Sequence, residues 1–290
     1  MLREIEHFLT TEDGARLCLV EVAPCSVLFR SGRHVFMTHG TFSDRRICMG
    51  LARHLAARGA CCWVLEWRGH GHSAAAPAPF DFETIGRQDV PAALRYLVHT
   101  RGIRHLAAVT HSGGGIALTI ALQHAPALQA HVDRAALFAC QTSWAAPSGM
   151  ARLQLRLANW GSRLLGRIPG RALHLGPHDE AHHTMRQWFG WNLSGRFHGR
   201  NGTDFLAGMR LLRLPVMAIA GEGDHHIAPP AACRRFLEAF GGPAKRFLLA
   251  GPTFGHASVL SSRASRSDIW PAVCAWLIDD ASTKEAAQPS

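Results

Sequence analysis

Long apolar runs, a secretory leader and a high content of charged residues are all missing from this sequence. No apolar run approaches the eighteen or so residues that a membrane span needs, so we expect no transmembrane segment. The opening MLREIEHFLTTEDG mixes acidic and basic residues around no apolar core, which predicts no signal peptide and, by default, a cytoplasmic protein. With 47% hydrophobic and 18% charged residues, the composition is that of a globular chain with a sizeable core.

Lysine is almost absent, because only two of the 31 basic residues are lysines, Lys245 and Lys284. Arginine therefore supplies nearly all of the positive charge behind the formal net charge of +10. The arginines are spread along the chain and do not gather with aromatic residues in one segment, as a nucleic-acid footprint would require. We expect no nucleic-acid partner, and only a weak attraction to anionic surfaces.

Motifs for metals and cofactors are also missing. Eight cysteines are present without a C-x-x-C pair, and several lie in apolar runs such as RLCLV and ACCWVL, which indicates reduced core residues. Neither a phosphate loop of the form G-x-x-x-x-G-K-[ST] nor a dinucleotide motif G-x-G-x-x-G occurs. Adjacent histidines stand at 182–183 and 225–226, but they lack acidic partners at i+4 spacing. We therefore expect no cofactor and no metal ion.

A regular alternation of strand-like and helix-like segments is what the chain does have. Strands at 5–10 and 15–23 flank a turn at Asp13-Gly14, which predicts an opening hairpin. Further strands are expected at 34–39, 60–67, 105–110, 135–141, 215–221 and 245–251. Helices are expected at 45–59, 83–102, after residue 112, at 230–240 and at 267–280. This order predicts an α/β fold: a mostly parallel, doubly wound sheet with an antiparallel N-terminal hairpin.

The alternation is interrupted between Trp144 and about Leu212, where no strand-like run occurs. This stretch contains helix-like pieces such as MARLQLRLANWGSRLL, together with several aromatic residues and histidines. We therefore predict a core formed by residues 1–143 and 213–290, and a helical cap or lid inserted at 144–212.

The segment VTHSGGGIAL, residues 109–118, places Ser112 and three glycines between a strand-like and a helix-like run. Three glycines at a helix start are unfavourable, because each loses more backbone entropy on folding than alanine. A nucleophile elbow, G-x-S-x-G, accounts for them, since its sharp turn exposes the serine oxygen and directs the next amide at a developing oxyanion. Gly114 fits the second glycine of this pattern, whereas Thr110 stands where the first is usual.

Polar residues also follow other predicted strands, at the edge of the sheet where open α/β sheets bind ligands. His39-Gly40-Thr41, Asp224 and His256 each come at or soon after the end of a strand. A serine needs a base to take its proton, and the base needs a third group to orient it. Glu222 and Asp204 are alternative candidates for the acid, but Asp224 fits the loop after the strand better.

In these motifs and their order the chain resembles the α/β-hydrolase superfamily, over roughly residues 5–279. The segments are HG at 39–40, EWRGHGHS at 66–73, the elbow, GEGDHHIAP and FGHASVL. The second is similar to D-x-R-G-H-G-x-S of the lipase and esterase branches, with Glu66 in place of the aspartate. His70 and His72 are expected to be structural parts of this turn.

The resemblance implies a catalytic triad in which Ser112 is the nucleophile, His256 the base and Asp224 the acid. It also implies an oxyanion hole formed by the backbone amides of Thr41 and Gly113. A serine nucleophile excludes the dehalogenase and epoxide hydrolase branches, which use aspartate at this position.

The expected substrate is a small-molecule ester with an apolar acyl group, cleaved through an acyl-enzyme intermediate. Six aromatic residues of the predicted cap suit either an acyl pocket or packing onto the core: Trp144, Trp160, Trp188, Phe189, Trp191 and Phe197. The pocket residues that we predict are His39, Phe42, His111, Trp144, Trp188 and Trp191. Alternatives are an acyltransferase or thioesterase with the same triad, and a non-catalytic binding protein of this fold.

Overall fold

An eight-stranded sheet runs through the computed structural model, which describes residues 1–26, 28, 32–76, 78–146 and 148–279. Its strand order is β1-β2-β4-β3-β5-β6-β9-β10. The hairpin of β1 (Leu2–Thr10) and β2 (Arg16–Pro24) is antiparallel, and β2 pairs antiparallel with β4 (Cys61–Glu66). The other pairings are parallel and join β4 to β3 (His34–Thr38), β5 (Leu106–His111), β6 (Val132–Phe138), β9 (Val216–Gly221) and β10 (Lys245–Ala250). The predicted mostly parallel sheet with an N-terminal hairpin is confirmed.

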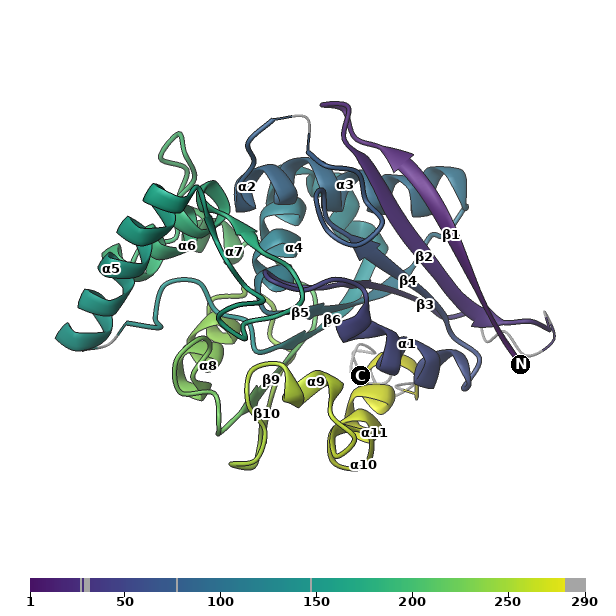
Figure 1. Ribbon diagram of the computed structural model, residues 1–290. Helices are drawn as coiled ribbons and strands as arrows, with labels where there is room; N and C mark the ends of the chain where they lie inside the picture. Colours follow the sequence, from purple (N-terminus) through teal and green to yellow (C-terminus); the bar gives the residue numbers. More distant parts are fainter. Residues whose placement is uncertain (27, 29–31, 77, 147, 280–290) are drawn as a thin grey trace.

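Helices connect the strands and cover both faces of the sheet (Figure 1). The face near α1 (Arg46–Ala56) also carries α9 (Ser258–Ser261), α10 (Ser265–Asp268), α11 (Trp270–Cys274) and a final π-helical turn, η5 (Ala275–Asp279). The opposite face carries α4 (Gly113–His124), which leads into a 3-10 turn, η4 (Pro126–His131). It also carries one continuous helical stretch made of α2 (Phe82–Thr84), η2 (Ile85–Asp89), α3 (Val90–Arg95) and η3 (Tyr96–Thr100). Between β9 and β10 lies α8 (Pro230–Glu238).

Two hydrophobic cores form because neighbouring residues of each strand point to opposite faces of the sheet. In β2, Leu17 and Leu19 pack into the core beneath α3 and α4, while Cys18 and Val20 pack into the core beneath α1. Both faces of the central strands are buried, so these strands are mostly apolar, as is usual for parallel strands covered by helices. Their polar residues Glu66, Thr110 and His111 stand at the carboxyl ends of β4 and β5.

Residues 144–212, called the insertion below, lie between β6 and β9 and include α5 (Gly149–Leu165), α6 (His182–Ser194) and α7 (Phe205–Met209). Helix α5 lies at the opposite end of the molecule from the N-terminal hairpin (Figure 1). The prediction of no strand here is wrong in one detail, because β7 (Arg167–Ile168) and β8 (Glu180–Ala181) form a two-stranded antiparallel ladder. Strands of two residues are too short to produce an alternation that a sequence can reveal.

All eight cysteines lie in the described ranges and none forms a disulfide. Seven are buried, in agreement with the interpretation as reduced core residues, and Cys25 is exposed. Burial raises the pKa of Cys140 to about 12, so this thiol is neutral and packs as an apolar side chain.

In the described part of the chain no helix combines the length and the apolar character needed to cross a membrane.

Candidate active site

Ser112 stands at the tip of the turn between β5 and α4. Its backbone angles, φ +52° and ψ −122°, are ones that residues with a side chain rarely adopt. The turn is held because the Ser112 N–H donates to the carbonyl of Phe138 at 2.8 Å, and the Gly115 N–H donates to the Ser112 carbonyl at 3.1 Å. Strain that the surroundings hold in place is typical of functional sites.

The turn at Ser112 packs directly against the loop that follows β3. A Cβ atom on Gly114 would lie only 2.6 Å from the carbonyl oxygen of His39. From the other side, a Cβ atom on Gly40 would lie 2.7 Å from the Ser112 Cβ. Side chains do not fit at either position, so both glycines are required by the close approach of two backbones.

The glycines on either side of Gly114 are required by their own neighbours. A Cβ atom on Gly113 would lie 2.6 Å from the ring of Phe82. On Gly115 it would lie 2.6 Å from the Cys140 Sγ and 3.2 Å from the Thr110 Oγ1. Gly115 thus leaves the room that Thr110 needs at a position where glycine is usual.

Ser112, His256 and Asp224 form one hydrogen-bonded line. The His256 Nε2 lies 2.9 Å from the Ser112 Oγ, and its Nδ1 lies 2.6 Å from the Asp224 Oδ2. A carboxylate only accepts, so Nδ1 carries the proton and Nε2 is left to accept from the serine hydroxyl. The three side chains come from the loops after β5, β9 and β10, at the carboxyl edge of the sheet.

Asp224 is buried and accepts hydrogen bonds from three residues. Besides His256, its carboxylate accepts the backbone N–H groups of Ile227 and Ala228, both at 3.1 Å. Burial alone would raise the pKa of Asp224, but the hydrogen bond and charge of His256, together with the two amides, outweigh burial and lower it. The carboxylate therefore stays ionised at neutral pH.

The competing acids lie elsewhere. Glu222 is exposed, and Asp204 caps α7 by accepting the N–H of Ala207 at 2.9 Å. Of the three acids, Asp224 is the one that the structure brings to His256.

The adjacent histidines are not gathered into a ligand cluster. His182 Nδ1 lies 2.9 Å from the hydroxyl of Ser162, and the rings of His225 and His226 are 6.4 Å apart. Across the described ranges, no three Cys, His, Asp or Glu side chains are grouped so that they could hold a metal ion.

His39 supports the loop after β3 and does not line the cavity at Ser112 that is described below, which corrects one pocket prediction. Its Nε2 accepts the N–H of Trp67 at 3.1 Å, so its Nδ1 carries the proton and donates to the Gly40 carbonyl at 2.7 Å. Burial lowers the pKa of His39 well below its usual range, and the ring is neutral. Both ring nitrogens are therefore used in shaping the loop next to Ser112.

The insertion contacts the loop after β3 at Phe42. The φ angle of Phe42, +60°, is unusual for a residue with a side chain, as is that of Ser112. The Phe42 N–H donates to the Glu180 Oε2 at 3.2 Å, and the Phe42 carbonyl accepts the N–H of His178 at 3.2 Å. The His178 side chain continues to Asp44, with 2.8 Å between Nε2 and Oδ2. Residues 178 and 180 thus hold residues 42 and 44; we call this set of contacts the clasp.

The clasp is anchored on His70, in the turn after β4. The His70 Nε2 lies 3.2 Å from the Glu180 Oε2, and both side chains are almost completely buried. Burial alone would lower the pKa of His70, but the Glu180 carboxylate and a hydrogen bond to the Arg68 carbonyl outweigh it and raise the pKa. A buried charge pair therefore connects the insertion to the core.

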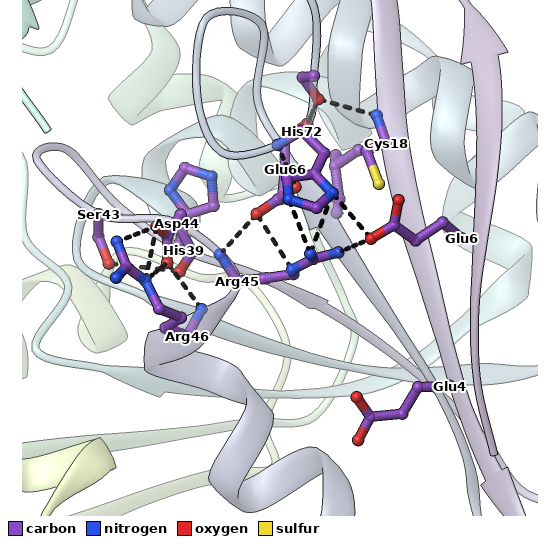
Figure 2. Close-up of polar contacts among 12 residues, drawn as sticks. Glu4, Glu6, Cys18, His39, Ser43, Asp44, Arg45, Arg46, Glu66 and His72 are labelled. Atoms are coloured by element: carbon purple, nitrogen blue, oxygen red, sulfur yellow. Dashed lines mark hydrogen bonds and ion pairs between the residues drawn. The ribbon is translucent and has the colours of Figure 1, made fainter. Parts of the chain in front are cut away.

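Glu66, which replaces the aspartate usual in this motif, fills the space beneath the same turn. It is buried and accepts the backbone N–H groups of His72 at 2.7 Å and of Arg45 at 3.3 Å. Figure 2 shows the Arg45 side chain between Glu66 and Glu6, with His72 beside it. The longer acid thus joins the turn after β4 to the start of α1, just beyond the clasped loop.

A cavity of about 370 Å³ opens above Ser112, within the size range of small-molecule sites. Of the predicted pocket residues, Phe42, His111 and Trp188 line it, together with Thr41 and Gly113. His39, Trp144 and Trp191 do not line it, which corrects these predictions. Trp191 is buried in the core with its Nε1 donating to the His198 carbonyl at 2.8 Å, and Trp144 packs against that core.

His111 borders both Ser112 and His256. Its Nε2 lies 2.9 Å from the His256 carbonyl oxygen and must donate to it, since a carbonyl only accepts. Burial, reinforced by the neighbouring His256, lowers the pKa of His111 to about 3. The ring is therefore neutral and adds no charge beside the base.

Much of the cavity wall comes from apolar residues of the insertion that the sequence analysis did not select: Leu155, Ile168, Leu173, Leu175 and Met185. Phe189, one of the six aromatic candidates, also lines the cavity, whereas Phe197 is buried in the core and Trp160 is exposed. Residues 185, 188 and 189 have helical i, i+3, i+4 spacing, and this signal was available in the sequence.

Comparison of the chain with known protein families and solved structures agrees with this architecture. A family model described as the alpha/beta hydrolase fold matches residues 33–160. No curated protein matches the sequence significantly. An esterase from Exiguobacterium antarcticum is 15% identical with a TM-score of 0.70, over 94% of this chain and 99% of its own. A soluble variant of the Saccharomyces cerevisiae monoglyceride lipase, with a substrate analogue, is 16% identical with a TM-score of 0.69, over 93% and 94%. A thermophilic esterase from Thermogutta terrifontis is 16% identical with a TM-score of 0.63, over 94% and 98%.

Substitution Gly115→Ala tests the packing behind the elbow. We expect the free energy of unfolding to fall by about 1–3 kcal/mol, because the new Cβ overlaps the Cys140 Sγ. Cys140→Ala in the same chain removes that sulfur, so the double variant should be more stable than the sum of the single changes predicts. Urea unfolding measures both quantities.

The matched control is Gly161→Ala in α5, where a Cβ meets no atom within 4 Å. It should leave stability unchanged or raise it by up to about 1 kcal/mol, since alanine is the better helix former. A loss at 161 as large as the loss at 115, or no loss at 115, would contradict the close packing that we assign to Gly115.

Substitution Glu180→Gln tests the charge pair of the clasp. It leaves His70 buried without its counter-charge, and we expect a loss of about 3 kcal/mol near pH 6. The folded-state pKa of His70 is raised in the native chain, so the stability that this pair contributes is complete below the ordinary histidine pKa of about 6.5. It is lost as the pH rises through the raised value.

The difference in unfolding free energy between the native chain and Glu180→Gln should therefore shrink as the pH rises above 6.5. Urea titrations from mildly acidic to alkaline pH measure it, with the exposed Glu238→Gln as control. A difference that stays constant or grows with pH would contradict the charged pair.

Proposed function

We propose that this chain, which has the α/β-hydrolase fold, is a serine hydrolase that cleaves carboxylic esters with an apolar acyl group. The observation that carries the proposal is the hydrogen-bonded line from Ser112 through His256 to Asp224, which ends at an apolar cavity. A serine held by a histidine and a buried acid is suited to nucleophilic attack on a carbonyl carbon.

In the first half-reaction, the Ser112 Oγ attacks the ester carbonyl while its proton passes to the His256 Nε2, 2.9 Å away. The tetrahedral intermediate collapses to an acyl-enzyme as the alcohol leaves with the proton from His256. In the second half-reaction, His256 takes a proton from water, whose oxygen attacks the acyl carbon. The carboxylic acid then leaves, and the proton returns to Ser112.

Asp224 would act through His256. Its low pKa keeps it ionised, so it fixes the proton on the His256 Nδ1 and stabilises the imidazolium that forms in each half-reaction. The neutral state of His111 suits this role, because a second positive charge beside the base would oppose that imidazolium.

The backbone amides of Thr41 and Gly113 would bind the oxyanion. Both residues line the cavity next to Ser112, and Gly113 begins α4, whose N-terminus favours negative charge. Thr41 precedes Phe42, the residue that the clasp holds at both its N–H and its carbonyl. We therefore propose that Glu180 and His178 position one of the two oxyanion donors.

The insertion would act as a cap that selects the acyl group. Its residues Ile168, Met185 and Phe189, with Phe42 from the core, form a buried apolar cluster at the cavity wall. Apolar walls favour an acyl chain over a charged or strongly polar group.

The test is covalent labelling by a fluorophosphonate probe, with Ser112→Ala as the decisive variant. We expect the native chain to be labelled and Ser112→Ala to remain unlabelled, and turnover of a p-nitrophenyl ester to fall about 10⁶-fold. Ser43 also lines the cavity but has no contact with the base, so Ser43→Ala should keep both labelling and turnover.

Folded native protein that resists the probe and cleaves no ester would refute the proposal. Labelling that survives Ser112→Ala but disappears in Ser43→Ala would place the nucleophile elsewhere. With labelling established, a series of p-nitrophenyl esters of increasing chain length should show higher kcat/KM for medium acyl chains than for acetate.

A further inference from the structure

Helix α5 turns an apolar stripe toward solvent. Its members are Met150, Leu153, Leu157, Trp160 and Leu164, which are 65%, 48%, 60%, 64% and 66% exposed. Their alternating spacing of three and four residues places all five on one side of the helix. The other side faces the protein, where Ser162 is buried and Leu155 lines the cavity. A helix at a protein surface normally has the reverse arrangement.

The stripe belongs to a local concentration of exposed apolar side chains. Single exposed leucines are common on protein surfaces. Here, however, eight of the fourteen large hydrophobic side chains that are exposed in the described part of the chain fall between residues 150 and 175. Large exposed apolar side chains gathered in this way are typical of a contact surface.

Positive charge accompanies the stripe. No aspartate or glutamate occurs between residues 134 and 178. Within 20 residues of this range there are five arginines: Arg152, Arg156, Arg163, Arg167 and Arg171. Although arginines occur along the whole chain, this segment contains several of them close to an exposed tryptophan. Arg156 and Arg163 are exposed on one flank of the stripe, and Trp160 lies between them in sequence. Basic side chains beside an apolar helix face with a tryptophan are typical of helices that lie in a membrane interface.

The stripe also adjoins the rim of the cavity. Ala158, next to Leu157 on α5, is exposed and lines the cavity. Leu173 and Leu175 are likewise both exposed and part of the cavity lining. Whatever contacts the stripe therefore lies beside the apolar entrance to Ser112.

We propose that this face of α5 docks onto anionic lipid bilayers, with the stripe in the apolar boundary and Arg156 and Arg163 at the lipid phosphates. The stripe spans about 21 Å along the helix at 1.5 Å per residue, which suits a helix lying in the plane of the interface. A second copy of the chain fits less well, because pairing two such faces would bring arginines together without an acid to neutralise them. The docking itself does not depend on the proposed hydrolase activity.

Co-sedimentation with vesicles tests the proposal. We expect the native chain to bind vesicles of equal parts phosphatidylglycerol and phosphatidylcholine, and to bind much less to phosphatidylcholine alone or at raised salt. The double variant Leu157→Glu/Leu164→Glu should bind the anionic vesicles about tenfold more weakly or less. Its matched control is Leu211→Glu/Leu249→Glu, in which two exposed leucines outside the stripe are changed and binding is retained.

Two further measurements separate the apolar and the electrostatic contributions. Trp160 fluorescence should shift to shorter wavelength with anionic vesicles, and Trp160→Phe should lose that shift, since Trp160 is well exposed in the free protein. The double variant Arg156→Gln/Arg163→Gln should bind anionic vesicles more weakly, and its binding should depend less on salt. Its control is Arg104→Gln/Arg246→Gln, in which two exposed arginines elsewhere are changed; this variant should show smaller changes in both binding and salt dependence.

Three outcomes would overturn the proposal, once thermal unfolding shows that each variant is folded. Native protein that does not sediment with anionic vesicles is one, and equal binding by the native chain and Leu157→Glu/Leu164→Glu is another. The third is that the native chain binds no vesicles but is a dimer in sedimentation velocity, while Leu157→Glu/Leu164→Glu is a monomer. This result would assign the stripe to contact with a second copy of the chain. Fluorophosphonate labelling in the absence of lipid reports on the hydrolase proposal separately, because neither leucine lines the cavity.

Discussion

The close approach of two backbone segments, the turn at Ser112 and the loop after β3, is the constraint on which the candidate site depends. Gly40 and Gly114 permit this approach from opposite sides, and a side chain at either position would collide within 3 Å. Because parallel strands β3 and β5 are neighbours in the sheet, their carboxyl ends deliver both segments to the same place. Ser112, Thr41 and Gly113 then line one cavity.

The clasp stabilises one side of this arrangement from a distant part of the chain. Phe42 is held in an unusual backbone conformation by Glu180, and Glu180 is itself held by His70. A buried charge pair adds little net stability compared with apolar residues of the same size, but breaking it by removing one partner is strongly unfavourable. The pair is therefore better suited to fixing the position of the insertion over the site than to strengthening the fold. Glu180 lies in β8, whose partner β7 follows α5 directly, so the proposed docking helix and the clasped loop are joined by a short path.

The sheet and the order of its elements could be predicted from the sequence because buried parallel strands are continuous apolar runs and the helices between them end at glycines or polar residues. The position of the elbow could also be predicted, since three glycines directly after a serine are unfavourable in a helix unless a sharp, closely packed turn requires them. The residues that line the cavity could not be predicted fully, because the cavity wall depends on how the insertion packs onto the core. Trp191 and Phe189 are two residues apart on α6, yet Trp191 is buried in the core while Phe189 lines the cavity. Aromatic residues suit both environments, and only three-dimensional packing distinguishes them.

Thr110 and Glu66, which depart from the usual motifs of α/β-hydrolases, could be identified from the sequence, but the neighbours that accommodate them could not. The physical cause is similar at both positions. Thr110 is accommodated because Gly115 leaves room beside Cys140, and Glu66 is accommodated because Gly71, with a φ of +54°, leaves room beneath the turn after β4. A Cβ on Gly71 would lie 1.9 Å from the Glu66 Oε1, so this glycine and the longer acid fit together. In each case the residue that compensates lies five positions along the chain, across a turn whose geometry the sequence does not specify. A departure from a motif is thus best interpreted together with the glycines that face it in space.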